Sequence, residues 1–146
     1  MLDHDAYQRS FAEVLKAAGL PHGAIVRTGP LPQADMPVLY RVADALIFAS
    51  VKEGFGLVVL EAMASGLPVV TSRMAPFTEY LSEEDAAWCD PFDAQSIARA
   101  MARAIGAPRR QSLIAKGAVV AARHNWRAVA SAHLLVYEQL CEVEHA

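Results

Sequence analysis

Two short, almost uninterrupted apolar runs constrain the fold of this chain most. The runs "ALIFAS" (45–50) and "PVVTS" (68–72) lack an alternation of apolar and polar residues, which is typical of strands buried on both faces. Between them, "LVVLEAMAS" (57–65) predicts a helix that ends at Gly66 and Pro68. A strand, a helix and another strand in this order indicate a parallel sheet covered by helices.

The same alternation extends along the rest of the chain, whose 146 residues fit a single domain. We therefore predict an α/β fold: a partial Rossmann-like, doubly wound parallel sheet with about four strands and extra C-terminal helices. The further predicted strands are 24–29 and 86–90, and the further predicted helices are 3–19, 34–44, 75–81, 93–106, 108–124 and 125–144.

Composition argues against several classes of protein. The net charge is −3 and the basic residues are scattered, so we expect no nucleic-acid partner. The histidines form no HxxxH set, and Cys89 and Cys141 form no CxxC pair, which argues against a metal site and favours buried, reduced thiols. No apolar run reaches the ~18 residues of a membrane helix, and the start lacks the pattern of a signal peptide. We expect a cytoplasmic domain without a transmembrane segment.

The stretch "EGFGLVVLE" (53–61) follows the first buried run and leads into the predicted helix. In parallel sheets, ligands bind at this position, where a strand ends and a helix begins. Gly54 and Gly56 argue against helix at 54–56, so Glu53 belongs to the loop and Glu61 lies about one turn inside the helix. One alternative is structural: Glu53 caps the helix and Glu61 is a solvated surface residue.

The start of this helix offers groups that suit a particular kind of ligand. The amides near Gly56, Leu57 and Val58 and the helix dipole favour a phosphate, and the glycines let the backbone approach it closely. Carboxylates repel phosphate but accept hydrogen bonds from hydroxyl groups. Two carboxylates around a phosphate site therefore predict a ligand with sugars on either side of a diphosphate, which is a nucleotide sugar.

The segment "YRVADALIFASVKEGFGLVVLEAMASGLPVVTSRMAPFTEYL" resembles the donor-binding half of retaining glycosyltransferases of the GT-B fold, family 4, which carry an E-x7-E motif. The segments "WCDPFDAQSIARAMARAI" and "HNWRAVASAHLLVYEQL" resemble the parts of that family that follow the motif. The resemblance implies an enzyme of the hexosyltransferase type. Such an enzyme moves a sugar from a nucleotide diphosphate sugar to an acceptor and retains the anomeric configuration.

The resemblance also implies roles for individual residues. Glu61 would accept hydrogen bonds from the ribose hydroxyls, and Glu53, the candidate catalytic residue, would contact hydroxyls of the transferred sugar. Leu31, in the loop "GPLP", matches the position where the family binds the base. The other donor-binding candidates are Gly54, Phe55, Gly56, Leu57 and Val58. Family members usually need no metal, so we expect no metal and no cofactor besides the nucleotide sugar.

The chain departs from the family in what it lacks. It contains no acceptor domain and no counterpart of the first part of the donor domain, which supplies an Arg and a Lys to the diphosphate. We therefore expect a domain truncated on its N-terminal side that transfers sugar poorly alone. A separate acceptor-domain chain or a homo-oligomer would complete it, and Arg73 is one candidate to reach the cleft.

Two alternatives remain open. The chain could be a non-catalytic module, from a truncated or split gene, that binds nucleotide or serves as an interaction partner. A sugar-nucleotide epimerase of similar fold fits less well, because the pattern EGFGL…LEAMA points to transferases.

Overall fold

The computed structural model describes residues 4–143, and the side chains of residues 6–141. Contacts divide the chain into two units, Met1–Pro32 and Gln33–Ala146, and each is described separately. The outermost residues of two predicted helices, 3 and 144, lie outside the described part.

The first unit contains one helix, α1 (His4–Ala17), among its described residues. Arg27 folds back on this helix: its Nη2 donates to Gln8 Oε1 over 2.7 Å, and its guanidinium lies 5.6 Å from the centre of the Phe11 ring. The predicted strand 24–29 is wrong, because these residues form no strand and are exposed. A β-branched pair such as Ile25-Val26 becomes a strand only where a neighbouring strand accepts its backbone hydrogen bonds.

The second unit alternates strands and helices as predicted. Its elements are a 3₁₀ turn η1 (Gln33–Asp35), α2 (Met36–Val42), β1 (Leu46–Phe48), α3 (Leu57–Ala64), β2 (Val69–Ser72), α4 (Phe77–Tyr80), β3 (Ala87–Cys89), α5 (Ala94–Ile105), α6 (Arg109–Arg123) and α7 (Trp126–Val143). The elements of this unit are shorter than predicted by one to four residues at their ends.

The three strands form one parallel sheet in the order β1-β2-β3. Leu46 pairs with Val69 in the first register, and Val70 pairs with Ala87 in the second. The predicted α/β parallel fold is confirmed, with three strands in the described residues where the sequence suggested about four.

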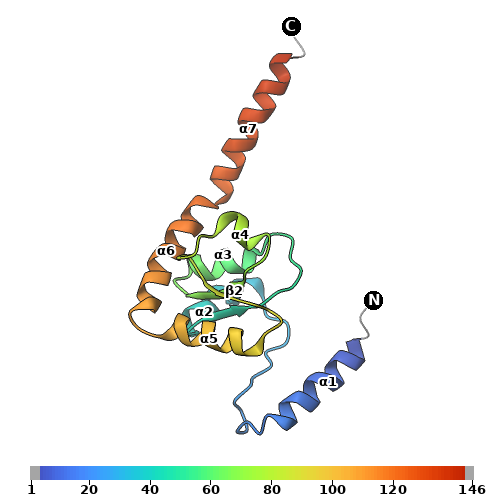
Figure 1. Cartoon of the computed structure of the whole chain (residues 1–146). Helices are drawn as coiled ribbons and strands as arrows, with labels where there is room; N and C mark the ends of the chain where they lie inside the picture. The colour runs from blue at the N-terminus through green and yellow to red at the C-terminus, as the bar shows by residue number, and fades with distance from the viewer. Residues whose placement is uncertain (1–3, 144–146) are drawn as a thin grey trace. The chain divides into compact units, whose positions relative to one another are not determined.

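Helices cover both faces of the sheet (Figure 1), so that side chains alternate between two cores. Val69 and Trp88 point into the core formed with α2, α3, α4 and the second half of α6. Val70, Ala87 and Cys89 point into the core formed with α5 and the start of α6, which includes Ala100, Ala104 and Leu113. This burial on both faces explains why β2 is buried throughout and reads as an uninterrupted apolar run.

Individual residues explain one helix start and one close contact between helices. Asp93 caps α5: its Oδ1 accepts from the amide of Gln95 over 2.8 Å, which satisfies an otherwise unpaired amide. On α6, Gly117 allows α3 to approach closely, because a Cβ there would lie 3.0 Å from Cγ of Met63.

The last helix, α7, differs from the others in its exposure. Its described side chains, residues 126–141, are all exposed, including Trp126, Leu134, Tyr137 and Leu140. The expectation of two buried thiols is half right: Cys89 is buried, but Cys141 is exposed on this helix. No helix in the described part of the chain is long and apolar enough to cross a membrane.

Candidate functional site

The motif loop leaves the sheet at a point where two strands are joined by hydroxyl groups. Ser72, at the end of β2, donates from Oγ to the carbonyl of Ser50 over 2.6 Å. Thr71 donates from Oγ1 to the carbonyl of Phe48 over 3.2 Å. Ser50 in turn donates from Oγ to the carbonyl of Lys52 over 3.0 Å. The hydroxyl groups at the end of β2 thus satisfy partly buried carbonyls and fix the start of the loop.

Gly56 is the residue at which the loop becomes helix. It is the N-cap of α3, with φ +81° and ψ +46°, and no side chain caps the helix. An L-residue there would be strained, and its Cβ would overlap the ring of Phe77. The change from loop to helix at this point therefore requires both the conformation and the small size of this glycine. The structural alternative for Glu53, a helix cap, is not observed.

Leu57 is the first residue of α3, which puts Glu61 one turn inside the helix, as predicted. The first amides of a helix have no carbonyl partner within it. Since α3 has no capping side chain, the amides at Gly56, Leu57 and Val58 form the positive end of the helix dipole. Leu57 is exposed and Val58 is half-buried.

Glu61 meets a tyrosine from a neighbouring helix. The hydroxyl of Tyr40, on α2, donates to Oε2 of Glu61 over 3.1 Å. Burial and this contact with the carboxylate raise the pKa of Tyr40 to about 12, so the hydroxyl stays a donor even at pH 10, where a solvent-exposed tyrosine is about half ionised. A cavity of about 240 Å³ lies beside the pair; its lining is Gln33, Met36, Pro37, Tyr40, Glu61, Ala64 and Ser65.

Glu53 has a different set of neighbours. Its Oε1 accepts from the amide of Gly54, the next residue, over 2.8 Å. Tyr80, on α4, lies close enough for the charge of Glu53 to act on it: burial first, and then this charge, raise the pKa of Tyr80 to about 12. The hydroxyl of Tyr80 donates to the carbonyl of Phe55 over 3.1 Å. Each motif glutamate thus lies near a tyrosine supplied by another helix.

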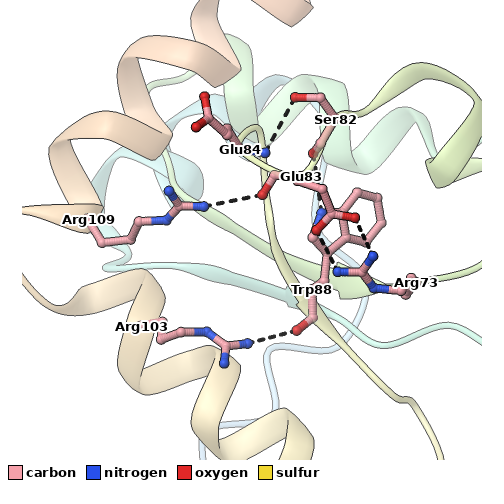
Figure 2. Close-up of polar contacts among 7 residues, drawn as sticks. All are labelled: Arg73, Ser82, Glu83, Glu84, Trp88, Arg103 and Arg109. Atoms are coloured by element: carbon pink, nitrogen blue, oxygen red, sulfur yellow. Dashed lines mark hydrogen bonds and ion pairs between the residues drawn. The ribbon is translucent and has the colours of Figure 1, made fainter.

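Two further residues, Leu31 and Arg73, were predicted to contribute. Leu31 belongs to the first unit, where it is exposed, and its contact with a base stays a prediction. Arg73 has partners within the protein: its guanidinium pairs with both carboxylate oxygens of Glu83 and lies over the Trp88 ring (Figure 2). This pairing lowers the pKa of Glu83.

A second cavity, about 700 Å³, runs along β3 and is lined by none of the motif residues. Two of its three arginines donate to backbone carbonyls: Arg103 donates to the carbonyl of Trp88 over 3.0 Å, and Arg109 donates to the carbonyl of Glu83 over 3.3 Å (Figure 2). We infer that this groove has a structural role, because these two arginines hold β3 and the turn before it in place. Within the described residues, no three His, Cys, Asp or Glu side chains gather as a metal site requires; that the reaction needs no metal stays a prediction.

Three aromatic residues that shape the candidate site were not predicted from the sequence: Tyr40, Phe77 and Tyr80. Tyr40 lies 21 residues before its partner Glu61, and Tyr80 lies 25 residues after Phe55. The one available signal was their position on short helices next to the two strands. Nothing in the local pattern distinguishes these rings from ordinary core residues.

Comparisons with known proteins agree with this fold. The family model described as "Glycosyl transferases group 1" matches residues 6–120. O-antigen chain mannosyltransferase B of Escherichia coli is 30% identical over 123 residues, which are 84% of this chain and 32% of that protein.

Two solved structures are similar over nearly the whole chain. Sucrose-phosphate synthase of Thermosynechococcus elongatus matches with a TM-score of 0.81 and 28% identity, over 94% of this chain and 35% of that one. Anabaena HepE, solved in complex with UDP and glucose, matches with a TM-score of 0.79 over 97% of this chain and 38% of that one. At 21% identity the second likeness concerns the fold alone. The chain spans about a third of the length of these relatives.

Proposed function

Because the chain belongs to the glycosyl transferases group 1 family, we propose that it is the donor-binding part of a retaining, family 4 glycosyltransferase. The full reaction moves a sugar from a nucleotide diphosphate sugar to an acceptor. One observation carries the proposal: the uncapped start of α3 lies between two glutamates, Glu53 in the loop before it and Glu61 one turn inside it. This arrangement suits a diphosphate with a sugar on either side.

Glu61 is the residue we assign to the nucleoside. Its carboxylate accepts one hydrogen bond from Tyr40, and a carboxylate can accept several more. The ribose hydroxyls supply such donors, and the cavity of about 240 Å³ beside Glu61 gives them room. Leu31 contributes an apolar contact to the base in this proposal.

Glu53 is the residue we assign to the transferred sugar. Its one hydrogen bond among the described residues comes from the amide of Gly54, so the carboxylate keeps acceptor capacity for sugar hydroxyls. The amides of Gly56, Leu57 and Val58 hold the diphosphate, while Gly54 and Phe55 shape the loop. As the glycosidic bond breaks, negative charge grows on the nucleotide diphosphate, and the positive end of α3 stabilises it without a metal.

The donor class is part of the proposal. A mannosyltransferase among the relatives and a fold neighbour solved with UDP and glucose support a nucleotide diphosphate hexose. UDP and GDP are therefore the probes to try first.

Calorimetric titration of the 146-residue chain with UDP and GDP tests the assignment. We expect binding of at least one nucleotide by the wild type, and a loss of roughly 10-fold or more in affinity for Glu61→Gln, because a charge-assisted hydrogen bond is removed. Glu138→Gln, a substitution at an exposed site on α7, is the matched control and should bind like the wild type. Equal affinity of the wild type and Glu61→Gln would remove Glu61 from the nucleoside role.

A second candidate function follows from the extent of the match. The chain spans about a third of its relatives, and the alternative is a module that binds nucleotide without transferring sugar. Incubation of the chain with labelled nucleotide hexoses and simple acceptors, with and without a supplied acceptor domain, separates the two, because only a donor-binding part of an enzyme gains transfer when the acceptor domain is added. We expect binding without efficient transfer until an acceptor domain, in the same protein or another chain, is supplied.

A further inference from the structure

Phe55 lies between the two glycines of the motif, yet burial does not hold it. Its side chain is 44% exposed, and Gly54 has open space around it. A loop of this composition has a large choice of backbone conformations. A contact outside the loop must therefore select the one observed.

Tyr80 supplies that contact in two ways. Its ring stacks on the Phe55 ring, with centroids 5.2 Å apart and planes 20° from parallel. Its hydroxyl donates to the carbonyl of Phe55 over 3.1 Å. One side chain thus holds both the side chain and the backbone of the residue between the glycines.

The rings of Phe77 and His124 both pack against the ring of Tyr80. Phe77, 1% exposed, meets the Tyr80 ring edge-on at 6.3 Å and also fills the space under Gly56. His124, at the end of α6, packs its ring 5.4 Å from Tyr80 and 6.4 Å from Phe55. Its Nδ1 lies 2.9 Å from the carbonyl of Val120, which sets the orientation of the ring.

We propose that Tyr80 is a positioning residue for the donor site. By holding the ring and carbonyl of Phe55, it fixes the loop from Glu53 to Gly56, which leads into the uncapped start of α3, before a ligand arrives. Preorganisation of this kind removes part of the entropy cost of binding. The inference rests on the proposed function, because it assigns the fixed loop to nucleotide binding.

Tyr80→Phe tests this role with the smallest possible change, since it keeps the ring and removes only the hydroxyl. Two measurements use the full chain: amide hydrogen exchange of residues 54–58 without ligand, and calorimetric affinity for UDP and GDP. We expect exchange at 54–58 to become roughly three- to tenfold faster, because one hydrogen bond no longer opposes local opening. Affinity for the bound nucleotide should weaken by a similar factor.

Phe55→Leu is the second variant, because it removes the stacked ring and keeps the carbonyl acceptor; it should change both measurements in the same direction. Tyr137→Phe removes the same hydroxyl from an exposed tyrosine of α7 and is the control. Exchange in α5 should stay unchanged in all variants, which separates a local effect from general destabilisation.

The exchange measurement and the affinity measurement together separate this inference from the function on which it rests. Unchanged exchange at 54–58 in Tyr80→Phe overturns the positioning role, whatever the affinity. Faster exchange with unchanged affinity also overturns it, because the loop would then be fixed without consequence for the ligand. Absence of nucleotide binding by the wild type overturns the proposed function, and with it the assignment of the loop to a donor.

Discussion

The two glutamates of the motif are held in different ways, although each lies near a tyrosine. Glu61 is on a helix, and its partner Tyr40 donates directly to its carboxylate. Glu53 is in a loop, and Tyr80 donates to the backbone of Phe55 two residues away. The position of Glu61 follows from the packing of two helices, whereas the position of Glu53 depends on the conformation of a glycine-containing loop.

This difference suggests a division of labour. A carboxylate fixed by helix packing suits the constant part of the donor, the nucleoside. A carboxylate on a loop can adapt to the hydroxyls of a particular sugar. The predictions that follow test this division, beginning with the residue that lies between the two glutamates.

Gly56→Ala should have the largest effect. The variant would strain a residue with φ +81° and force its Cβ into the ring of Phe77, which together cost about 2–4 kcal/mol of unfolding free energy. Gly66→Ala is the matched control, because its φ is +79° but no atom lies near the added Cβ; we expect a loss of about 1 kcal/mol. Urea denaturation measures both.

A similar loss for Gly56→Ala and Gly66→Ala would contradict the tight contact at the helix start. It would mean that the loop and Phe77 separate easily. Such a loop could not hold Glu53 in a fixed place.

Removing the charge of each glutamate in turn should separate their roles. Glu61→Gln should weaken UDP or GDP affinity roughly 10-fold or more, as stated above. Glu53→Gln should leave affinity for the nucleotide alone within about twofold and weaken affinity for the nucleotide sugar, because its partners are sugar hydroxyls. Calorimetry with both ligands gives the comparison, and equal losses for the two variants would abolish the proposed division.

Alkaline pH tests the surroundings of both glutamates through their tyrosines. The folded chain raises the pKa of Tyr40 and of Tyr80 from 10.0 to about 12. Their contribution to stability is therefore full below pH 10 and is lost as the pH rises from 10 to 12, because only the unfolded chain ionises in that range.

Urea denaturation between pH 8 and pH 11 measures this loss. Tyr40→Phe and Tyr80→Phe should each flatten the decline, since each removes one ionising group. An identical pH dependence in the wild type and both variants would show that neither hydroxyl is held as described.

The smallest effect is expected outside the motif, at Glu83. This exposed carboxylate pairs with Arg73, and exposed pairs contribute little to stability. Because pairing lowers the pKa of Glu83 from 4.5, the contribution exists above pH 4.5 and disappears as the pH falls through the lowered value. Glu83→Gln should leave nucleotide affinity within about twofold; a larger change in calorimetry would extend the site to the groove along β3.

The local pattern of the chain predicted much of the fold. The run around β2 is apolar because both faces of this parallel strand are buried, and Gly54 and Gly56 marked the loop before α3. The prediction that the run 45–50 is buried on both faces is wrong for β1, because β1 pairs on one side only in the described sheet and Ile47 is exposed. Residues 24–29 have a similar local composition, but a strand needs a neighbour to pair with, and pairing is not a local property.

The site was predictable as far as its backbone and its glutamates. Tyr40 and Tyr80 were not, because each meets its partner across 21 or 25 residues of chain. The exposure of Cys141 was missed for the same reason: an apolar helix face indicates burial only if another element covers it.

The chain's two tryptophans provide optical reporters that need no labelling. Trp88 is 8% exposed, donates from its indole nitrogen to the carbonyl of Ser82 over 3.2 Å, and lies under the guanidinium of Arg73. Trp126 is 82% exposed at the start of α7. Acrylamide should quench the emission of Trp126 first, which leaves a blue-shifted signal from Trp88. In a Trp126→Phe background, the intrinsic fluorescence of the chain then reports the turn beside β3 alone.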